Sequence, residues 1–211
     1  MPIPAWTAKG VIAPIDIFDP VSPDRSPYPA TLAEVVQRFA TTTERCEILS
    51  GYFSHRAALH AAGLTSGFQW LDGSFLEDIE TISSRAPQDI DVVTYFSLPA
   101  GMTQAQVLAA NPALFPADAP AVAAFKAQYR VDAYEVDLQM PPVHLVMHTT
   151  YWYSMWSHRR NEDWKGYVQV DLAPGEDAGA IQDLHNIAAN LAQPQQPAAN
   201  VGGVVPPGAG P

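Results

Sequence analysis

The spacing of apolar side chains between residues 31 and 63 predicts two consecutive helices. Thr31 followed by Glu34 is a capping-box pattern, so we expect the first helix to start there and to run to about Phe39. A second helix is expected over residues 44–62. Gly63 follows it directly, which is typical of the end of a helix.

Beyond residue 63, apolar runs bounded by turn residues predict strands set between further helices. Strands are expected at residues 68–72, 90–96, 131–138 and 165–172. Helices are expected near residues 103–114 and 119–129, over the aromatic-rich stretch 143–157, and at residues 176–192. No internal repeat is present, so this succession describes one domain rather than an array.

The two ends of the chain differ in composition from the middle. Residues 1–29 are rich in proline and lack periodicity, which predicts an irregular N-terminal arm over the domain. The domain itself is expected to span residues 30–192. Residues 193–211 contain five prolines, no charge and no aromatic side chain, a composition typical of a disordered tail.

Composition narrows the class of protein. The chain has 211 residues, 47% of them hydrophobic, which favours a single globular domain with a substantial core. A net charge of −11 argues against bulk nucleic-acid binding through a broad basic surface. The single cysteine, Cys46, excludes an internal disulfide and is expected to be buried. Without a signal-like segment or an apolar run long enough for a bilayer, we expect a cytoplasmic protein with no membrane partner.

Acidic residues gather in one part of the chain. Residues 72–91 contain six acids and a single base, Arg85. Asp89 and Asp91 are two positions apart at the start of a predicted strand, so both carboxylates should project from the same face. Like charges that close raise each other's pKa unless a cation lies between them. The neighbouring sequence supplies no such cation, which predicts a bound divalent metal.

Residues around these acids suggest what the metal would do. Magnesium is usually held by one or two carboxylates together with phosphate oxygens. Gly73 lets the backbone approach a phosphate group closely, and Ser74 can donate a hydrogen bond to it or, with Glu77, simply cap a helix. A third carboxylate, from Asp132 or Asp137 on a later strand, could activate an incoming hydroxyl.

These motifs carry a family resemblance. Leu71-Asp72-Gly73-Ser74 followed by Asp89-Ile90-Asp91-Val92 resembles the signature of the nucleotidyltransferase superfamily typified by DNA polymerase beta. Arg130-Val131-Asp132-Ala133 is similar to the context of that superfamily's third aspartate, which favours Asp132. Over residues 45–172 the chain also looks like uncharacterised bacterial nucleotidyltransferase-like proteins related to toxin–antitoxin and phage-defence transferases. Trp-Leu-Asp-Gly-Ser-Phe, Asp-Ile-Asp-Val-Val and Lys-Gly-Tyr-Val carry that likeness.

The resemblance implies a fold and an activity. The fold would be mixed α+β, a small mixed sheet flanked by helices. Asp89, Asp91 and Asp132 would bind Mg²⁺ or Mn²⁺, and Asp132 would also help to deprotonate the acceptor. The enzyme would transfer a nucleotide monophosphate from a nucleoside triphosphate to a hydroxyl of a protein, an RNA or a small molecule.

Further residues are predicted to bind the nucleotide. Gly73 and Ser74 would contact the triphosphate. Lys165 lies in the Lys-Gly-Tyr-Val stretch and would bind the nucleotide as well. Arg85 could reach the triphosphate or, as a loop residue, balance nearby acids.

A second interpretation is a protein that keeps the fold without turnover and acts as a binding or regulatory partner, for instance in a toxin–antitoxin or defence system. Fourteen residues separate Ser74 from Asp89, more than the superfamily usually has, and the acidic charge would favour a basic partner protein.

Three groups of residues outside the motifs are expected to have structural roles. Arg159 and Arg160 are expected in a solvated loop. Trp152, Tyr153 and Trp156 are expected in the core, and His144 and His148 in helix packing rather than in a zinc site.

Overall fold

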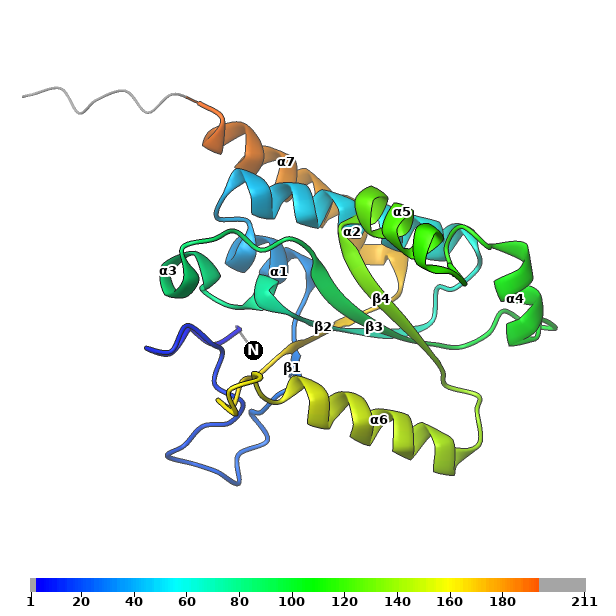
Figure 1. The fold of residues 1–211 in the computed structure, drawn as a ribbon, viewed down its shortest axis with the longest axis horizontal. Coiled ribbons are helices and arrows are strands. Elements are labelled where there is room, and N and C mark those ends of the chain that lie inside the picture. The colour runs from blue at the N-terminus through cyan, green and yellow to red at the C-terminus, as the bar shows by residue number, and fades with distance from the viewer. Residues whose placement is uncertain (1–2, 194–211) are drawn as a thin grey trace, which may run out of the picture.

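A mixed five-stranded sheet forms the centre of the molecule (Figure 1). The computed structural model describes residues 3–193. The strand order is β1 (Tyr28–Pro29), β5 (Val168–Asp171), β2 (Gly67–Asp72), β3 (Ile90–Phe96) and β4 (Val131–Asp137). β2 runs antiparallel to both β3 and β5, whereas β4 is parallel to β3 and β1 is parallel to β5. The expectation of a small mixed sheet flanked by helices is confirmed.

Helices cover both faces of the sheet. The long helix α2 (Thr43–Ala61) lies on one face with α1 (Leu32–Phe39), α5 (Ala119–Tyr129) and α7 (Asp177–Leu191), and α6 (Pro142–Trp156) lies alone on the other (Figure 1). α4 (Gln104–Ala110) is at the end of the molecule beside α5. Within the described residues no helix is both long and apolar enough to cross a membrane.

Local sequence signals predicted most of these elements. The Thr31 side chain accepts a hydrogen bond from the Glu34 amide at 3.1 Å, and the Glu34 carboxylate accepts one from the Thr31 amide at 2.8 Å, so the capping box is confirmed. The expected strands at 68–72, 90–96 and 131–138 match β2, β3 and β4 to within one residue at each end. The fourth strand is shorter than expected, because residues 165–167 lie outside the sheet ladder.

β1 and α3 (Ile79–Ser83) had no counterpart in the predictions. β1 is two residues long and exists only because the amides of Tyr28 and Ala30 donate to the carbonyls of Tyr167 and Gln169, each at 2.9 Å. α3 is five residues long, too short for a helical period to be recognised. Both depend on tertiary contacts rather than on local pattern.

The N-terminal segment is integrated into the fold. Residues 3–27 contain isolated bridges and turns but no helix. Ile3, Ile12 and Tyr28 nevertheless belong to the main hydrophobic core, and residues 9–12 run alongside the segment after α6. The tail expected at residues 193–211 lies, beyond Gln193, outside the described residues.

A buried arginine joins three elements on the helical face of the sheet. Arg56 of α2 is fully buried. Its guanidinium donates to both carboxylate oxygens of Asp177 at the start of α7, at 2.9 and 2.8 Å, and to the side-chain oxygen of Gln69 in β2 at 2.8 Å. Because a buried cation without a partner is costly, Asp177 holds α7 in place against α2 and the sheet.

We predict that Asp177→Asn lowers the free energy of unfolding by about 2–3 kcal/mol, because it leaves the Arg56 charge buried without its carboxylate. Urea denaturation followed by circular dichroism measures this loss. Glu47→Gln, which removes an exposed acid from α2, is the matched control and should change stability by less than about 0.5 kcal/mol. Equal stability of the two variants would contradict this role of Asp177.

Candidate active site at the acidic end of the sheet

Three aspartates lie side by side on adjacent strands. Asp72, the last residue of β2, is in register with Asp91 of β3, and Asp91 is in register with Asp132 of β4. Residues in register on neighbouring strands project from the same face, with backbones about 4.8 Å apart. The sheet therefore forms a row of three carboxylates from segments 60 positions apart in sequence.

The row lies on the face of the sheet that α6 covers. Tyr134, two residues after Asp132, packs against Trp152 of α6 with ring centroids 4.5 Å apart. Because positions i and i+2 of a strand share a face, Asp132 points to the same side as Tyr134. The sequence identified Asp132 as one of two possible third carboxylates, and the structure places it next to Asp91.

The alternative, Asp137, is at the far end of the same strand. Asp137 is in register with Phe96 and lies five residues beyond Asp132, about 16 Å along the strand. Its carboxylate accepts a hydrogen bond from the Gln139 amide and belongs to a turn. Asp137 is therefore excluded from the row.

Asp89 lies beside the row, and the four aspartates Asp72, Asp89, Asp91 and Asp132 together form the acidic group. It directly precedes β3, two positions before Asp91, as the spacing predicts. Lys126 of α5 connects it to the row: the Lys126 ammonium is 2.7 Å from a carboxylate oxygen of Asp132 and 3.9 Å from one of Asp89. The structure thus brings together all three aspartates that the sequence assigned to metal binding, with Asp72 as a fourth.

Gly73 brings the turn after β2 directly against Asp91. Its φ is +85°, a conformation that favours glycine, and a Cβ atom added there would be 2.8 Å from an Asp91 carboxylate oxygen. Ser74 begins the short 3₁₀ helix η1 (Ser74–Leu76) and is half-buried. A side chain at position 73 would therefore displace the central carboxylate.

Ser74 and Glu77 do not form the capping box that their spacing suggested. The Glu77 amide donates to the backbone carbonyl of Ser74 at 3.2 Å, and no side-chain cap is present at η1. The Glu77 carboxylate instead binds Lys165 and Arg159. The capping interpretation is wrong because two distant cations compete for this acid.

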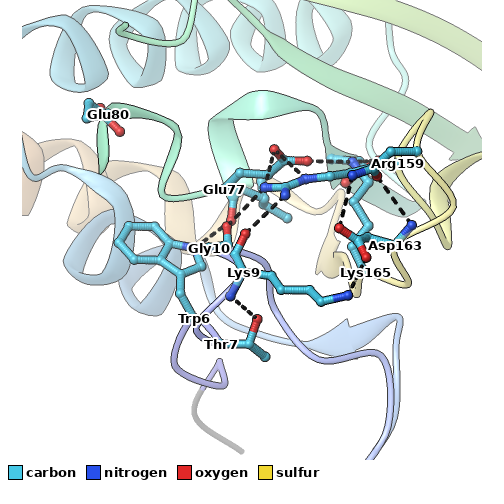
Figure 2. A network of polar contacts seen from close by, with 12 residues as sticks. Trp6, Thr7, Lys9, Gly10, Glu77, Glu80, Arg159, Asp163 and Lys165 are labelled. Carbon is cyan, nitrogen blue, oxygen red and sulfur yellow. Dashed lines mark hydrogen bonds and ion pairs between the residues drawn. The ribbon is translucent and has the colours of Figure 1, made fainter. Parts of the chain in front are cut away.

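Lys165 supplies positive charge at the Asp72 end of the row. Its ammonium is buried, 2.9 Å from an Asp72 oxygen and 3.4 Å from a Glu77 oxygen. Arg159 holds the second Glu77 oxygen at 2.8 Å and donates to the Lys9 carbonyl at 3.0 Å, while Lys9 pairs with Asp163. Figure 2 shows this network joining the N-terminal segment to the acidic end of the sheet.

The expected missing cation is thus partly supplied from distant parts of the chain. Lys126 lies 35 positions after Asp91, and Lys165 lies 93 positions after Asp72. Lys126, Lys165 and Arg159 face four aspartates and Glu77, so three cations stand against five carboxylates. Asp91, at the centre of the row, contacts neither lysine within salt-bridge distance.

The pKa values of the carboxyls reflect this imbalance. Burial raises the pKa of Asp91 to about 7, with further increases from Asp72, Asp89 and Asp132, and Lys165 only partly opposes them. Burial also raises the pKa of Asp72 to about 6, against the effect of Lys165. One Asp72 oxygen, Oδ1, is buried without a hydrogen-bond partner in the described residues. Carboxyls of this kind are poised to release a proton when a cation arrives.

Whether these residues fit a metal depends on the two lysines. No cluster of three or more metal-ligating side chains is preformed among residues 3–193. The carboxylates of Asp72, Asp89 and Asp132 face ammonium groups instead. The free Asp72 oxygen and the unneutralised Asp91 are the donors that could receive a divalent ion, and Asp89 and Asp132 could join them once Lys126 moved.

Arg85, the remaining residue assigned to the nucleotide, lies in the exposed loop after α3. Its guanidinium donates to the carbonyl of the adjacent Ala86 at 3.2 Å. This position agrees with the alternative of a loop arginine near local acids.

The residues expected to have structural roles differ in their burial. Trp152, Trp156 and Cys46 are buried as expected, but Tyr153 is 46% exposed, although its ring lies 6.3 Å from that of the buried Tyr167. His144 and His148 are also exposed on α6, so the expected role in helix packing is wrong. Arg159 is not a solvated loop residue, because Glu77 binds it, whereas Arg160 is exposed.

The sequence-based predictions did not include three residues that lie at this site. Asp72 could have been found, since it precedes Gly73 within the same acidic stretch. Glu77 was assigned to a local cap. Lys126 has no recognisable motif around it, and only the packing of α5 beside β4 brings it to the aspartates.

Comparison with known proteins identifies the family of the chain but indicates no activity. The model of DUF6932, described as a family of unknown function, matches residues 4–171. The chain belongs to this family. The match includes the N-terminal segment, all five strands and every residue of the acidic group. No curated protein and no solved structure matches the chain.

We predict that Asp91→Asn stabilises the metal-free protein at pH 8. The folded-state pKa of Asp91 is raised from 3.8 to about 7, so the wild-type protein loses stability as pH rises through this window. The neutral amide avoids the loss, and we expect a gain on the order of 2 kcal/mol at pH 8 that vanishes near pH 4. Urea titrations with EDTA at both pH values measure it. Asp19→Asn, in the exposed part of the N-terminal segment, serves as control; a destabilised Asp91→Asn at pH 8 would refute the electrostatic account.

We also predict that Gly73→Ala destabilises the protein by about 1–2 kcal/mol, through its positive φ and the contact with Asp91. Gly179→Ala in α7 is the matched control, because a Cβ there meets nothing within 4 Å. Its helical position should make it more stable by about 0.5–1 kcal/mol. Thermal unfolding of the two variants compares them directly, and the prediction fails if Gly73→Ala matches the wild type.

Proposed function

We propose that this protein transfers a nucleotide monophosphate from a nucleoside triphosphate to an acceptor hydroxyl, with Mg²⁺ or Mn²⁺. The observation that supports the proposal most strongly is the in-register row of Asp72, Asp91 and Asp132 beside the Gly73 turn. Carboxylates that share one face of a sheet next to a close backbone approach suit a metal-bound triphosphate.

The surplus negative charge favours a divalent cation. Asp91 has neither lysine in contact, although Lys126 and Lys165 pair with its neighbours Asp132 and Asp72. A bound Mg²⁺ would neutralise phosphate charge and orient the reacting groups. Asp91 and the free Asp72 oxygen would hold it, joined by Asp89 and Asp132. The two lysines, released from the carboxylates, would be available to the phosphate oxygens.

The remaining roles follow from position. The backbone at Gly73 and the Ser74 hydroxyl would contact the triphosphate, close to Asp91. Asp132, on the other side of Asp91, would accept the proton of the acceptor hydroxyl. Pyrophosphate would leave from the opposite side of the α-phosphorus, in line with the attacking oxygen.

The decisive experiment supplies each α-³²P-labelled nucleoside triphosphate with Mg²⁺ or Mn²⁺ and a cell lysate as a source of acceptors. We expect label on one class of acceptor with the wild-type protein and none with Asp89→Ala/Asp91→Ala. The control is Asp19→Ala/Asp24→Ala, which removes the same charge from exposed positions of the N-terminal segment. Equal labelling by both double variants, or no metal-dependent labelling at all, would refute the proposal.

A second candidate function is binding or regulation without turnover, possible within a toxin–antitoxin or defence system and directed at a basic partner protein. The ion pairs of Lys126 with Asp132 and of Lys165 with Asp72 favour it, because the lysines already bind carboxylates that a metal would need. The described residues also hold no preformed metal cluster. Calorimetric titration with Mg²⁺ and nucleotide separates the two functions. Metal-dependent nucleotide binding that Asp89→Ala/Asp91→Ala abolishes favours the enzyme, and its absence favours the regulatory role.

A further inference from the structure

A cavity of about 400 Å³ lies along the outer edge of β4, next to the carboxylate row. α4, α5 and the segment between them form its outer walls, and residues 132–135 of β4 form its floor. β4 is the last strand of the sheet, so no further strand covers this side. The volume is within the range of about 300–1,000 Å³ typical of small-molecule sites.

The walls of the cavity are mostly apolar, and its polar groups are few. Leu108, Leu114, Phe115, Val122 and Phe125 supply the apolar surface. Lys126 and Asp132 lie together at one end, joined by their 2.7 Å ion pair, and Glu135 is the other charged residue of the lining. An apolar body with one or two polar groups directed at Asp132 matches this distribution.

The cavity lies on the side of Asp91 opposite to the expected triphosphate. Gly73 and Ser74 follow β2, whereas the cavity borders β4, and β3 with Asp91 runs between them. Asp132 belongs to both the cavity lining and the carboxylate row. A hydroxyl bound in the cavity would thus reach Asp132 from one side while the nucleotide approached from the other.

We propose that this cavity binds the acceptor, and that the acceptor is a small molecule with a largely apolar body and one hydroxyl group. The assignment as acceptor rests on the proposed nucleotidyl transfer. A nucleic-acid acceptor fits poorly, because the cavity presents two carboxylates against one lysine, and the whole chain carries a charge of −11.

The reaction balances without any further reactant. The acceptor oxygen forms a bond to the α-phosphorus of the triphosphate, and the bond from that phosphorus to the bridging oxygen breaks. The hydroxyl proton passes to Asp132, and pyrophosphate leaves with the electron pair of the broken bond. Lys126 pairs with one Asp132 oxygen at 2.7 Å, and its move to the phosphate oxygens, as proposed above, would leave Asp132 free to accept the proton.

The first test measures binding alone, without metal or nucleotide. The full chain is titrated with 4-ethylphenol, and the methyl resonances of Val122 and Leu114 are followed by NMR. We expect saturable shifts with a dissociation constant on the order of a millimolar, as for other fragments of this size. A short oligouridylate is the polyanionic comparison and should shift neither residue.

Val122→Trp fills the cavity from α5, at a position 37% exposed, where the larger side chain is tolerated. It should weaken 4-ethylphenol binding at least about tenfold. Met147→Trp, on the exposed side of α6 and outside the cavity, should leave binding unchanged. Thermal midpoints confirm that both variants fold. Equal affinity of the two variants, or stronger shifts with oligouridylate, would overturn the proposal.

The second test separates this inference from the proposed function. Val122→Trp should retain metal-dependent nucleotide binding by calorimetry while it loses label transfer to the small-molecule fraction of a lysate. Label found only on protein or RNA would overturn the small-molecule acceptor and leave nucleotidyl transfer intact. If 4-ethylphenol binds but the wild-type protein binds no nucleotide, the proposed function is refuted, and the acceptor role that rests on it is refuted too. The cavity would then remain a binding site for a small apolar molecule.

Discussion

The balance of charge at the acidic end of the sheet is the constraint on which the rest of the structure depends. Strand pairing places Asp72, Asp91 and Asp132 on one face, where their charges repel. Lys126 and Lys165 offset part of that repulsion, and each belongs to a segment that must pack in one place to do so. α5 therefore lies beside β4, and the segment after α6 returns to β2.

The same constraint extends to the N-terminal segment. Lys165 shares Glu77 with Arg159, and Arg159 donates to the carbonyl of Lys9. A chain of polar contacts thus runs from Asp72 through Lys165, Glu77 and Arg159 to Lys9 and Gly10, and Figure 2 shows its part from Lys165 onward. The family match over residues 4–171 spans this entire network, so the segment is part of the domain that the family model describes.

An incomplete charge balance has a consequence for function. Asp91 sits at the centre of the row with no ammonium in contact, and its pKa is raised to about 7. A fully neutralised row would be a structural feature only, whereas an unneutralised one attracts a cation. The enzymatic and regulatory proposals differ in one physical respect, namely whether a divalent ion competes successfully with the lysines for these carboxylates.

The sequence by itself determined the elements whose signals are local: the capped helix at Thr31, the strands with Asp91 and Asp132, and the glycine before Ser74. Such features depend on neighbours within a few positions, so their pattern is visible in the chain. Only the tertiary structure decided that Asp132 rather than Asp137 lies beside Asp91, that Glu77 binds Lys165 instead of capping a helix, and that Lys126 joins Asp89 to Asp132. These outcomes depend on strand register and on helix packing, where residues far apart in sequence compete for the same charge.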